Sequence, residues 1–147
     1  MSVKRLIAGN FGSNYKAMKK LLFLLVLVAG FNLSYAQYSL TFCEDVSPEG
    51  KAQMVSNSFM VDGSGGVLKF LVKTEDKFNT DQLDFRIYYV NESGAEEELE
   101  RLAQKIDASW NFAWKEMVLF DPGNYRVKIY TGKGTYLTSA NLNVKKK

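Results

Sequence analysis

Acidic side chains are the residues of this sequence whose types and spacing could support chemistry. The first group is a dense cluster that consists of Glu96, Glu97, Glu98 and Glu100. The second group is looser and consists of Glu75, Asp76 and Asp81. A carboxylate-dependent hydrolase needs at least two carboxylates that converge on the substrate, and carboxylate oxygen atoms also bind calcium. The first group is a charge run, which more often forms a solvated face. The second lies in EDKFNTD, which lacks the dense Asp, Asn and Gly spacing of an EF-hand loop. We therefore expect no metal site and no cofactor.

Other catalytic arrangements are restricted by composition. The 147 residues include no histidine, which excludes His-assisted nucleophiles and His-containing zinc sites. The segment DGSGG, residues 62–66, lacks the lysine and the following helix of a phosphate-binding loop, and it is typical of a hairpin turn. We expect a protein that is not an enzyme, and a small carboxylate- or calcium-dependent hydrolase is the least favoured alternative.

The first 36 residues have the composition of a targeting signal. Two lysines follow Met18, an apolar run covers residues 21–29, and small residues flank Tyr35 just before Gln37. This is the order of a secretory signal peptide, and the apolar run is shorter than the ~20 residues that cross a bilayer. We expect an upstream extension, a true start at Met18 and a cleaved signal. The remaining protein would then be periplasmic or extracellular, with no membrane span.

Residues 37–147 then form a single domain by length. The segment 1–36 holds five of the 19 basic residues and none of the 16 acidic ones, so the domain has a net charge of 14 − 16 = −2. A nucleic-acid-binding surface needs a basic face with stacking aromatic residues, and a net acidic domain argues against one. The sequence leaves the oligomeric state open.

Cys43 is the only cysteine, so no disulfide can form within the chain. A free cysteine is most often a small buried hydrophobe. In an oxidising compartment it can also form an intermolecular disulfide. Tyr38, Leu40 and Phe42 share one face of the segment YSLTFCE, and Cys43 lies on the other face, which leaves both interpretations open.

Alternating apolar and polar residues, separated by turn residues, run along most of the domain. The segments with this period-two pattern are 38–44, 57–61, 67–74, 83–89, 125–130 and the last segment, which carries Ala140, Leu142 and Val144. Such alternation is typical of half-buried antiparallel strands. We therefore expect an all-β protein in which each strand turns one face toward the core.

Residues 96–106 follow a different pattern. Leu99, Leu102, Ala103 and Ile106 have the i, i+3, i+4, i+7 spacing of one helical face, and most of their neighbours are good helix formers. The strands on either side favour a strand here instead, because tertiary context can override propensity. The local pattern favours a short helix or an irregular crossover.

The segment DASWNFAWKEMVLF contains the densest group of aromatic residues. Its large apolar residues share even parity, and they are Trp110, Phe112, Trp114, Val118 and Phe120. On a strand they would line one face, either as a platform for a sugar or peptide or as part of the core, where large aromatic residues bury the most area. We expect the last four in the core and Trp110 at the start of the strand, partly exposed.

A proline-glycine pair interrupts two alternating runs in VLFDPGNYRVKIY, residues 118–130. Asp121, Pro122 and Gly123 have the chemistry of a type II turn, which predicts a sharp connection between two strands. Tyr125 comes directly after this turn and Asn124. In β-sandwiches a tyrosine at this place forms a tyrosine corner, with its ring in the core and its hydroxyl bonded to the main chain upstream.

Here the sequence resembles immunoglobulin-like domains, whose corner motif is Asp-x-Gly-x-Tyr. The match is DPGNY, and the segments FCE and GGVLKFLVK are similar to those of short exported bacterial domains. Val127 replaces the second cysteine of antibody domains, and Phe85 and Ile87 stand where the third strand would carry a tryptophan. The resemblance implies an immunoglobulin- or fibronectin-III-like sandwich of seven to eight strands, and it brings no catalytic residue.

Two functional classes remain for an exported sandwich. The first is a binding module for a protein or a glycan, with Tyr88, Tyr130 and Trp110 as the candidate contact residues. The hypothesis is supported if the three side chains form one patch, and it is weakened if they lie on opposite faces. The second class is a structural or inhibitor-like subunit that assembles through its first strand, where Cys43 could cross-link partners.

Overall fold

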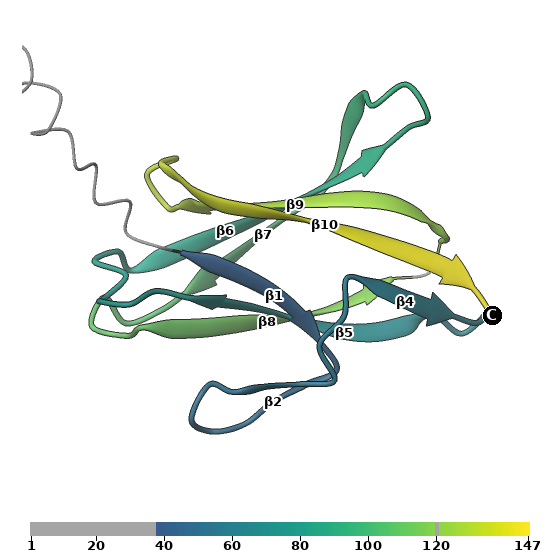
Figure 1. The fold of residues 1–147 in the computed structure, drawn as a ribbon. Helices are drawn as coiled ribbons and strands as arrows, with labels where there is room; N and C mark the ends of the chain where they lie inside the picture. The colour runs from purple at the N-terminus through teal and green to yellow at the C-terminus, as the bar shows by residue number, and fades with distance from the viewer. Residues whose placement is uncertain (1–37, 120) are drawn as a thin grey trace, which may run out of the picture. The chain divides into compact units, whose positions relative to one another are not determined.

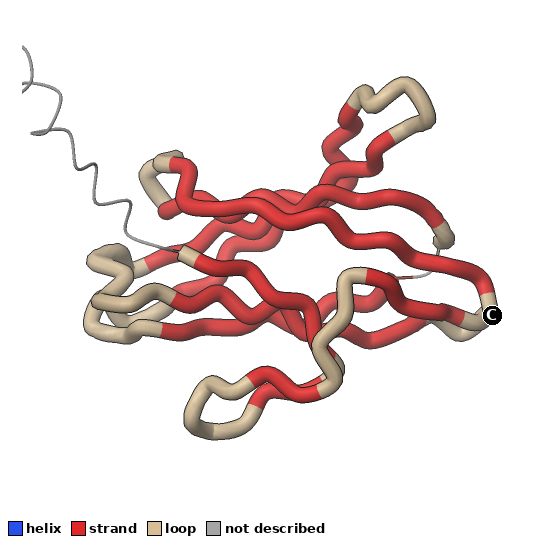
Figure 2. Tube along the Cα trace, in the orientation of Figure 1, coloured by secondary structure: helices blue, strands red, loops and turns tan. Residues whose placement is uncertain are grey.

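The alternating segments form strands in the computed structural model, which describes residues 38–119 and 121–147 (Figure 1). The strands are β1 (Ser39–Cys43), β2 (Asp45–Val46), β3 (Ala52–Gln53), β4 (Ser58–Val61), β5 (Gly66–Lys73), β6 (Gln82–Val90), β7 (Glu96–Lys105), β8 (Phe112–Leu119), β9 (Gly123–Thr131) and β10 (Tyr136–Lys146). Strands and loops make up all of the described residues, without a helix (Figure 2). The expected signal peptide lies outside these residues.

Two sheets face each other as a sandwich (Figure 1). The three-stranded sheet has the order β1-β5-β8, and the five-stranded sheet has the order β4-β10-β9-β6-β7. All neighbouring strands are antiparallel except β4 and β10, which are parallel. The prediction of an all-β sandwich is confirmed. Residues 38–119 and 121–147 contain ten strands rather than seven to eight, because the count includes β2 and β3, which are only two residues long and form a separate hairpin.

The core lies between the sheets and follows from the alternation of the strands. Along β6, Leu83, Phe85 and Ile87 are at most 2% exposed, and Phe70 of β5 and Val127 of β9 are fully buried. Period-two alternation places such residues on one face of each sheet. On the five-stranded sheet the opposite face then carries mostly polar side chains, such as Arg86 of β6 and Lys128 of β9.

The connection from β8 to β9 carries the chain from one sheet to the other and contains the tyrosine motif. The Tyr125 ring is 4% exposed, and its hydroxyl donates a 2.7 Å hydrogen bond to the main-chain oxygen of Asp121. Burial raises the pKa of this hydroxyl, so it keeps its proton and remains a donor. This is the arrangement of a tyrosine corner.

The prediction of a type II turn at this corner is wrong. Gly123 has a φ of 159° and begins β9, whereas the third residue of a type II turn needs a φ of about +80°. The glycine is required for space, because a Cβ atom at this position would lie 2.6 Å from Cε2 of Tyr89. The Tyr89 and Tyr125 rings meet edge to face, with their centroids 5.8 Å apart.

The prediction of a short helix or irregular crossover at residues 96–106 is also wrong. Residues 96–105 form β7, which pairs with β6 and has a bulge where Ile87 and Tyr88 shift register. An isolated helix of this length is marginal, and main-chain pairing along a neighbouring strand outweighs its propensity. Leu99 consequently lies 53% exposed at the edge of the sheet, whereas Ile106 is buried.

The expectation that Phe112, Trp114 and Val118 lie in the core is corrected in the same way. Trp114 is 37% and Val118 is 43% exposed, and the inner face of β8 instead carries Ala113, Met117 and Leu119. Phe112 is partly buried, but it packs in a separate apolar cluster on the outer face of the three-stranded sheet. Phe120, the fourth residue of that prediction, lies outside the described residues.

The β2–β3 hairpin explains why both faces of the three-stranded sheet carry apolar residues. It covers part of the outer face, where Cys43, Val46 and Leu71 form a small buried cluster with Ala52 and Phe112 at its margin. The loop of the hairpin lies on Phe112, because a Cβ atom at Gly50 would lie 2.6 Å from Cγ of that ring. Outward-facing apolar residues therefore have a packing role here, and parity alone could not identify the core face of β8.

Replacement of the corner tyrosine tests the fold directly. Tyr125→Phe should lower the free energy of unfolding by roughly 1 to 3 kcal/mol, because the buried tyrosine loses its hydrogen bond to the main-chain oxygen of Asp121. Chemical denaturation of wild type and variant measures the difference. Tyr136→Phe, at an exposed tyrosine, is the control and should leave the midpoint unchanged. Equal midpoints for Tyr125→Phe and wild type would contradict the corner.

Candidate binding surfaces

The first candidate surface is a groove along the free edge of β8, called here the tryptophan groove. Its volume is about 750 Å³, and its lining consists of Gln104 and the continuous segment Ser109, Trp110, Asn111, Phe112, Ala113, Trp114, Lys115 and Glu116. Residues from both faces of β8 take part, so the groove follows the edge of the strand rather than one face of the sheet. Gln104 comes from β7, the edge strand of the other sheet.

Both tryptophans of the chain lie in this groove. Trp110 is 49% and Trp114 is 37% exposed. The Trp110 main chain is fixed, because its amide donates to the oxygen of Asp107 at 3.0 Å and its oxygen accepts from the amide of Phe78 at 2.9 Å. Trp114 has the Lys69 ammonium 4.7 Å from its ring centroid, and Asp45 of β2 holds that ammonium at 2.5 Å. The main chain of Trp110 and one face of the Trp114 ring are therefore held by neighbouring groups.

The second candidate surface is the outer face of the five-stranded sheet. Tyr88 of β6 and Tyr130 of β9 point outward there, because their neighbours along each strand fill the core. Lys128 lies 4.5 Å from the centroid of the Tyr88 ring, and the Arg86 guanidinium lies 3.9 Å from that of Tyr130. The Tyr130 ring also meets Tyr136 edge to face at 5.7 Å.

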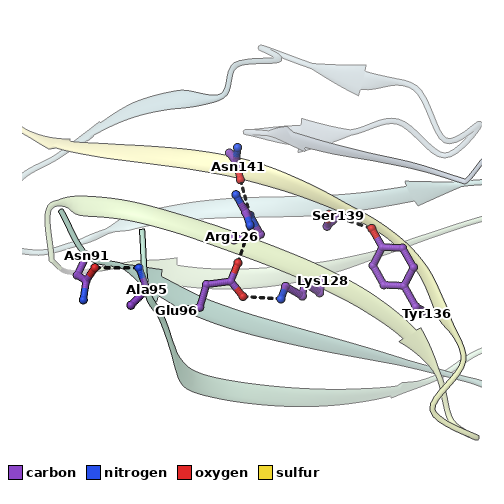
Figure 3. Close-up of polar contacts among 8 residues, drawn as sticks. All are labelled: Asn91, Ala95, Glu96, Arg126, Lys128, Tyr136, Ser139 and Asn141. Atoms are coloured by element: carbon purple, nitrogen blue, oxygen red, sulfur yellow. Dashed lines mark hydrogen bonds and ion pairs between the residues drawn. The ribbon is translucent and has the colours of Figure 1, made fainter. Parts of the chain in front are cut away.

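Glu96 organises the ion pairs of this second surface (Figure 3). Its carboxylate accepts a 2.6 Å hydrogen bond from Arg126 and another from the Lys128 ammonium. Arg126 also donates to Asn141 at 2.9 Å, which extends the network across three strands. The bond from Lys128 holds the pKa of Glu96 below its usual range, and the same bond raises the pKa of Lys128.

The three aromatic residues expected to make contacts do not form one patch. Trp110 lines the tryptophan groove, whereas Tyr88 and Tyr130 lie on the outer face of the five-stranded sheet. Sequence reasoning missed Trp114, because it assigned that residue to the core. It also missed Arg86 and Lys128, although their alternation with Phe85 and Val127 is the signal that places them on the outer face.

The acidic residues do not gather into a cluster of metal ligands in the described part of the chain. Residues 38–119 and 121–147 contain no group of three or more potential metal ligands. Glu96 and Glu98 are instead held by cations, since Arg101 donates to Glu98 at 3.1 Å. The same residues contain no helix long and apolar enough to cross a bilayer.

Cys43 is fully buried beneath the β2–β3 hairpin. Its Sγ donates to the main-chain oxygen of Lys69 at 3.6 Å, and burial raises the pKa of the thiol. A buried, protonated thiol reacts slowly. This environment fits the interpretation as a small hydrophobe, whereas an intermolecular disulfide would require the thiol to leave its cluster.

No protein-family model and no curated protein matches the sequence. Among solved structures, an immunoglobulin-like protein from Pseudomonas aeruginosa is 13% identical with a TM-score of 0.47, over 76% of this chain and 99% of that chain. A CARDB domain from Pyrococcus furiosus, solved with di-metal ions, is 10% identical with a TM-score of 0.40, over 78% and 99% of the two chains. Superoxide reductase (neelaredoxin) from Ignicoccus hospitalis is 15% identical with a TM-score of 0.42, over 80% and 88%. These similarities do not assign a ligand, a metal or an activity to this chain.

The strand order and the corner define the class of this protein, which is an immunoglobulin-like β-sandwich module. Within that class it is a sandwich without the inter-sheet disulfide of antibody domains. Val127 occupies the position of the second cysteine in the core, and Cys43 is the only cysteine of the chain.

The pH dependence of stability tests the ion pairs of Glu96. At neutral pH, Glu96→Gln should lower the free energy of unfolding by about 1 kcal/mol. Because the folded-state pKa of Glu96 is lowered, its contribution is complete above the ordinary glutamate pKa of 4.5 and is lost as the pH falls through the folded-state value. The gap between wild type and variant should therefore close in acid. Glu97→Gln, at an exposed neighbour, is the control, and a gap independent of pH would contradict the ion pairs.

Proposed function

We propose that this chain is an exported, non-catalytic module that binds a partner protein at the cell envelope or outside the cell. The partner contributes an extended segment, which pairs with the free edge of β8 and covers the tryptophan groove. The observation that carries the proposal is the coincidence of both exposed tryptophans with an unpaired strand edge. Addition of a strand to an exposed sheet edge is a recurrent mode of peptide recognition.

The free edge of β8 has room for another strand. In constant-type immunoglobulin domains a fourth strand pairs with the strand that corresponds to β8. In this chain residues 106–111 connect β7 directly to β8, and no strand among residues 38–119 and 121–147 pairs with that edge. The main-chain groups along the edge can therefore bond to an incoming segment.

The free edges of β7 and β8 differ in how well they are protected against pairing with another strand. Six of the ten residues of β7 are charged, and its pairing with β6 contains a bulge, whereas only two of the eight residues of β8 are charged. Charges and bulges are the means by which proteins prevent unwanted strand pairing. β7 has these protections, and β8 instead presents Trp114 beside its edge.

The chemistry of the partner follows from the side chains on either side of β8. Trp110 and Trp114 offer large, rigid surfaces that favour apolar or aromatic side chains at alternate positions of an extended segment. Lys115 and Glu116 are adjacent and opposite in charge, so the groove does not favour a partner of either net charge. The expected signal peptide supports the location, since it would place the module among envelope or extracellular proteins.

A glycan is the second candidate for the groove. The two indoles could stack on sugar rings, and Ser109, Asn111 and Gln104 supply polar groups for hydroxyls. A glycan would leave the main-chain edge of β8 unpaired, however, so amide exchange distinguishes the two ligands.

The test is selection of peptides from a random display library, in parallel with a glycan array. Trp110 and Trp114 are the only tryptophans, so fluorescence titration of the selected ligand reports on the groove itself. Trp110→Ala and Trp114→Ala should each weaken peptide binding about tenfold or more, as at interface hot spots. Tyr136→Ala removes an exposed aromatic residue from the other sheet and should leave the affinity unchanged.

Hydrogen exchange then tests the mode of binding. The peptide should slow exchange of β8 main-chain amides that face away from β5, because they acquire carbonyl partners. Unchanged exchange along β8, equal binding by the tryptophan variants, or a ligand found only on the glycan array would overturn the proposal. A shift of the protein alone from monomer to dimer, lost in both tryptophan variants, would support the assembly-subunit alternative instead.

A further inference from the structure

Positive charge is concentrated on the outer face of the five-stranded sheet. Six cations point outward there and define what we call the cationic face, and they are Arg86, Arg101, Lys105, Arg126, Lys128 and Lys145. The carboxylates on the same face are Asp84, Glu96 and Glu98, which gives 6 − 3 = +3. The domain of residues 37–147 as a whole has a net charge of −2, so the face opposes the overall charge.

Three of these cations are direct neighbours across the strands. Arg86 of β6 pairs in register with Arg101 of β7 on one side and with Lys128 of β9 on the other. Like charges placed directly opposite each other on a sheet are destabilising. Glu98 offsets Arg101 and Glu96 offsets Lys128, but Arg86 forms no ion pair among residues 38–119 and 121–147.

The Arg86 side chain is also incompletely satisfied. Its guanidinium lies over the Tyr130 ring at 3.9 Å, and its buried Nε has no hydrogen-bond partner. The neighbouring carboxylate of Asp84 is engaged by Gln82, which donates to it at 2.7 Å. A planar guanidinium can bind a carboxylate through charge-assisted hydrogen bonds, and because the Arg86 Nε is buried these bonds would come from its terminal Nη groups.

A shallow groove extends this face toward the end of β10. It measures about 480 Å³, and its outward-facing lining includes Arg126, Lys145 and the amides of Asn124, Asn141 and Asn143. Amide side chains both donate and accept hydrogen bonds, which suits sugar hydroxyls. Toward the other end, Tyr136 is 54% exposed beside Tyr130 and offers a ring for stacking.

We propose that the cationic face binds an acidic glycan, whose uronate carboxylates pair with Arg86 and Lys145 while its hydroxyl groups contact the asparagine amides. Cations alone would accept any polyanion. The combination of cations with amides and tyrosine rings on one face favours a chain that carries both carboxylates and hydroxyls. This site lies on the other sheet from the tryptophan groove and does not depend on it.

The test is calorimetric titration with hexagalacturonate, with its methyl ester as the neutral control of equal size. Wild type should bind the acid, and the affinity should fall as salt is added. Arg86→Gln should weaken binding about tenfold or more, since it removes a charge-assisted pair. Lys145→Gln, at an exposed position that does not threaten folding, should weaken it less.

Matched variants and competing anions complete the experiment. Lys73→Gln removes an exposed charge from the three-stranded sheet, and Trp114→Ala disables the tryptophan groove; both should bind hexagalacturonate as wild type does. Thermal melting establishes that Arg86→Gln is folded. Equal binding of the acid and its ester, unchanged affinity in both charge variants, or preference for hexaglutamate or a single-stranded oligonucleotide would overturn the proposal.

Discussion

The register of β8 against β5 is the constraint on which the surfaces of this domain depend. Because side chains alternate along a strand, this register turns Ala113 and Met117 inward and Trp114 outward. A shift by one residue would bury the indole and remove the groove. The tyrosine corner that follows leads the chain across to β9, so the same segment sets both the core and the exposed edge.

The two sheets consequently present different chemistry to solvent. The three-stranded sheet carries apolar side chains beside an unpaired edge, and its β2–β3 hairpin covers only the part over Cys43 and Leu71. The five-stranded sheet carries cations, tyrosines and amides, fixed by carboxylates such as Glu96 (Figure 3). Because these faces do not share residues, one module has room for two kinds of ligand. The proposed protein and glycan partners would therefore bind to different faces.

Sequence patterns predicted the parts of the structure in which one face alone is apolar. The strand 83–89 and the strand after DPGNY alternate cleanly, so their core residues and outward tyrosines followed directly. β8 was assigned to the wrong face because both of its faces contact apolar groups, one the core and one the hairpin cluster. β7 was taken for a helix because an edge strand with an exposed Leu99 lacks the period-two signal. The cationic face depends on cross-strand register, which no local pattern specifies.

The accessibility of the two tryptophans in the unliganded protein tests the central claim most directly. The account predicts that tryptophan emission of the native protein is red-shifted. Trp110→Phe and Trp114→Phe each keep a single tryptophan, and acrylamide should strongly quench the emission of that residue in both variants. Blue-shifted emission protected from acrylamide until the protein unfolds would contradict it. In that case Trp114 would lie in the core, and the register of β8 described above would be wrong.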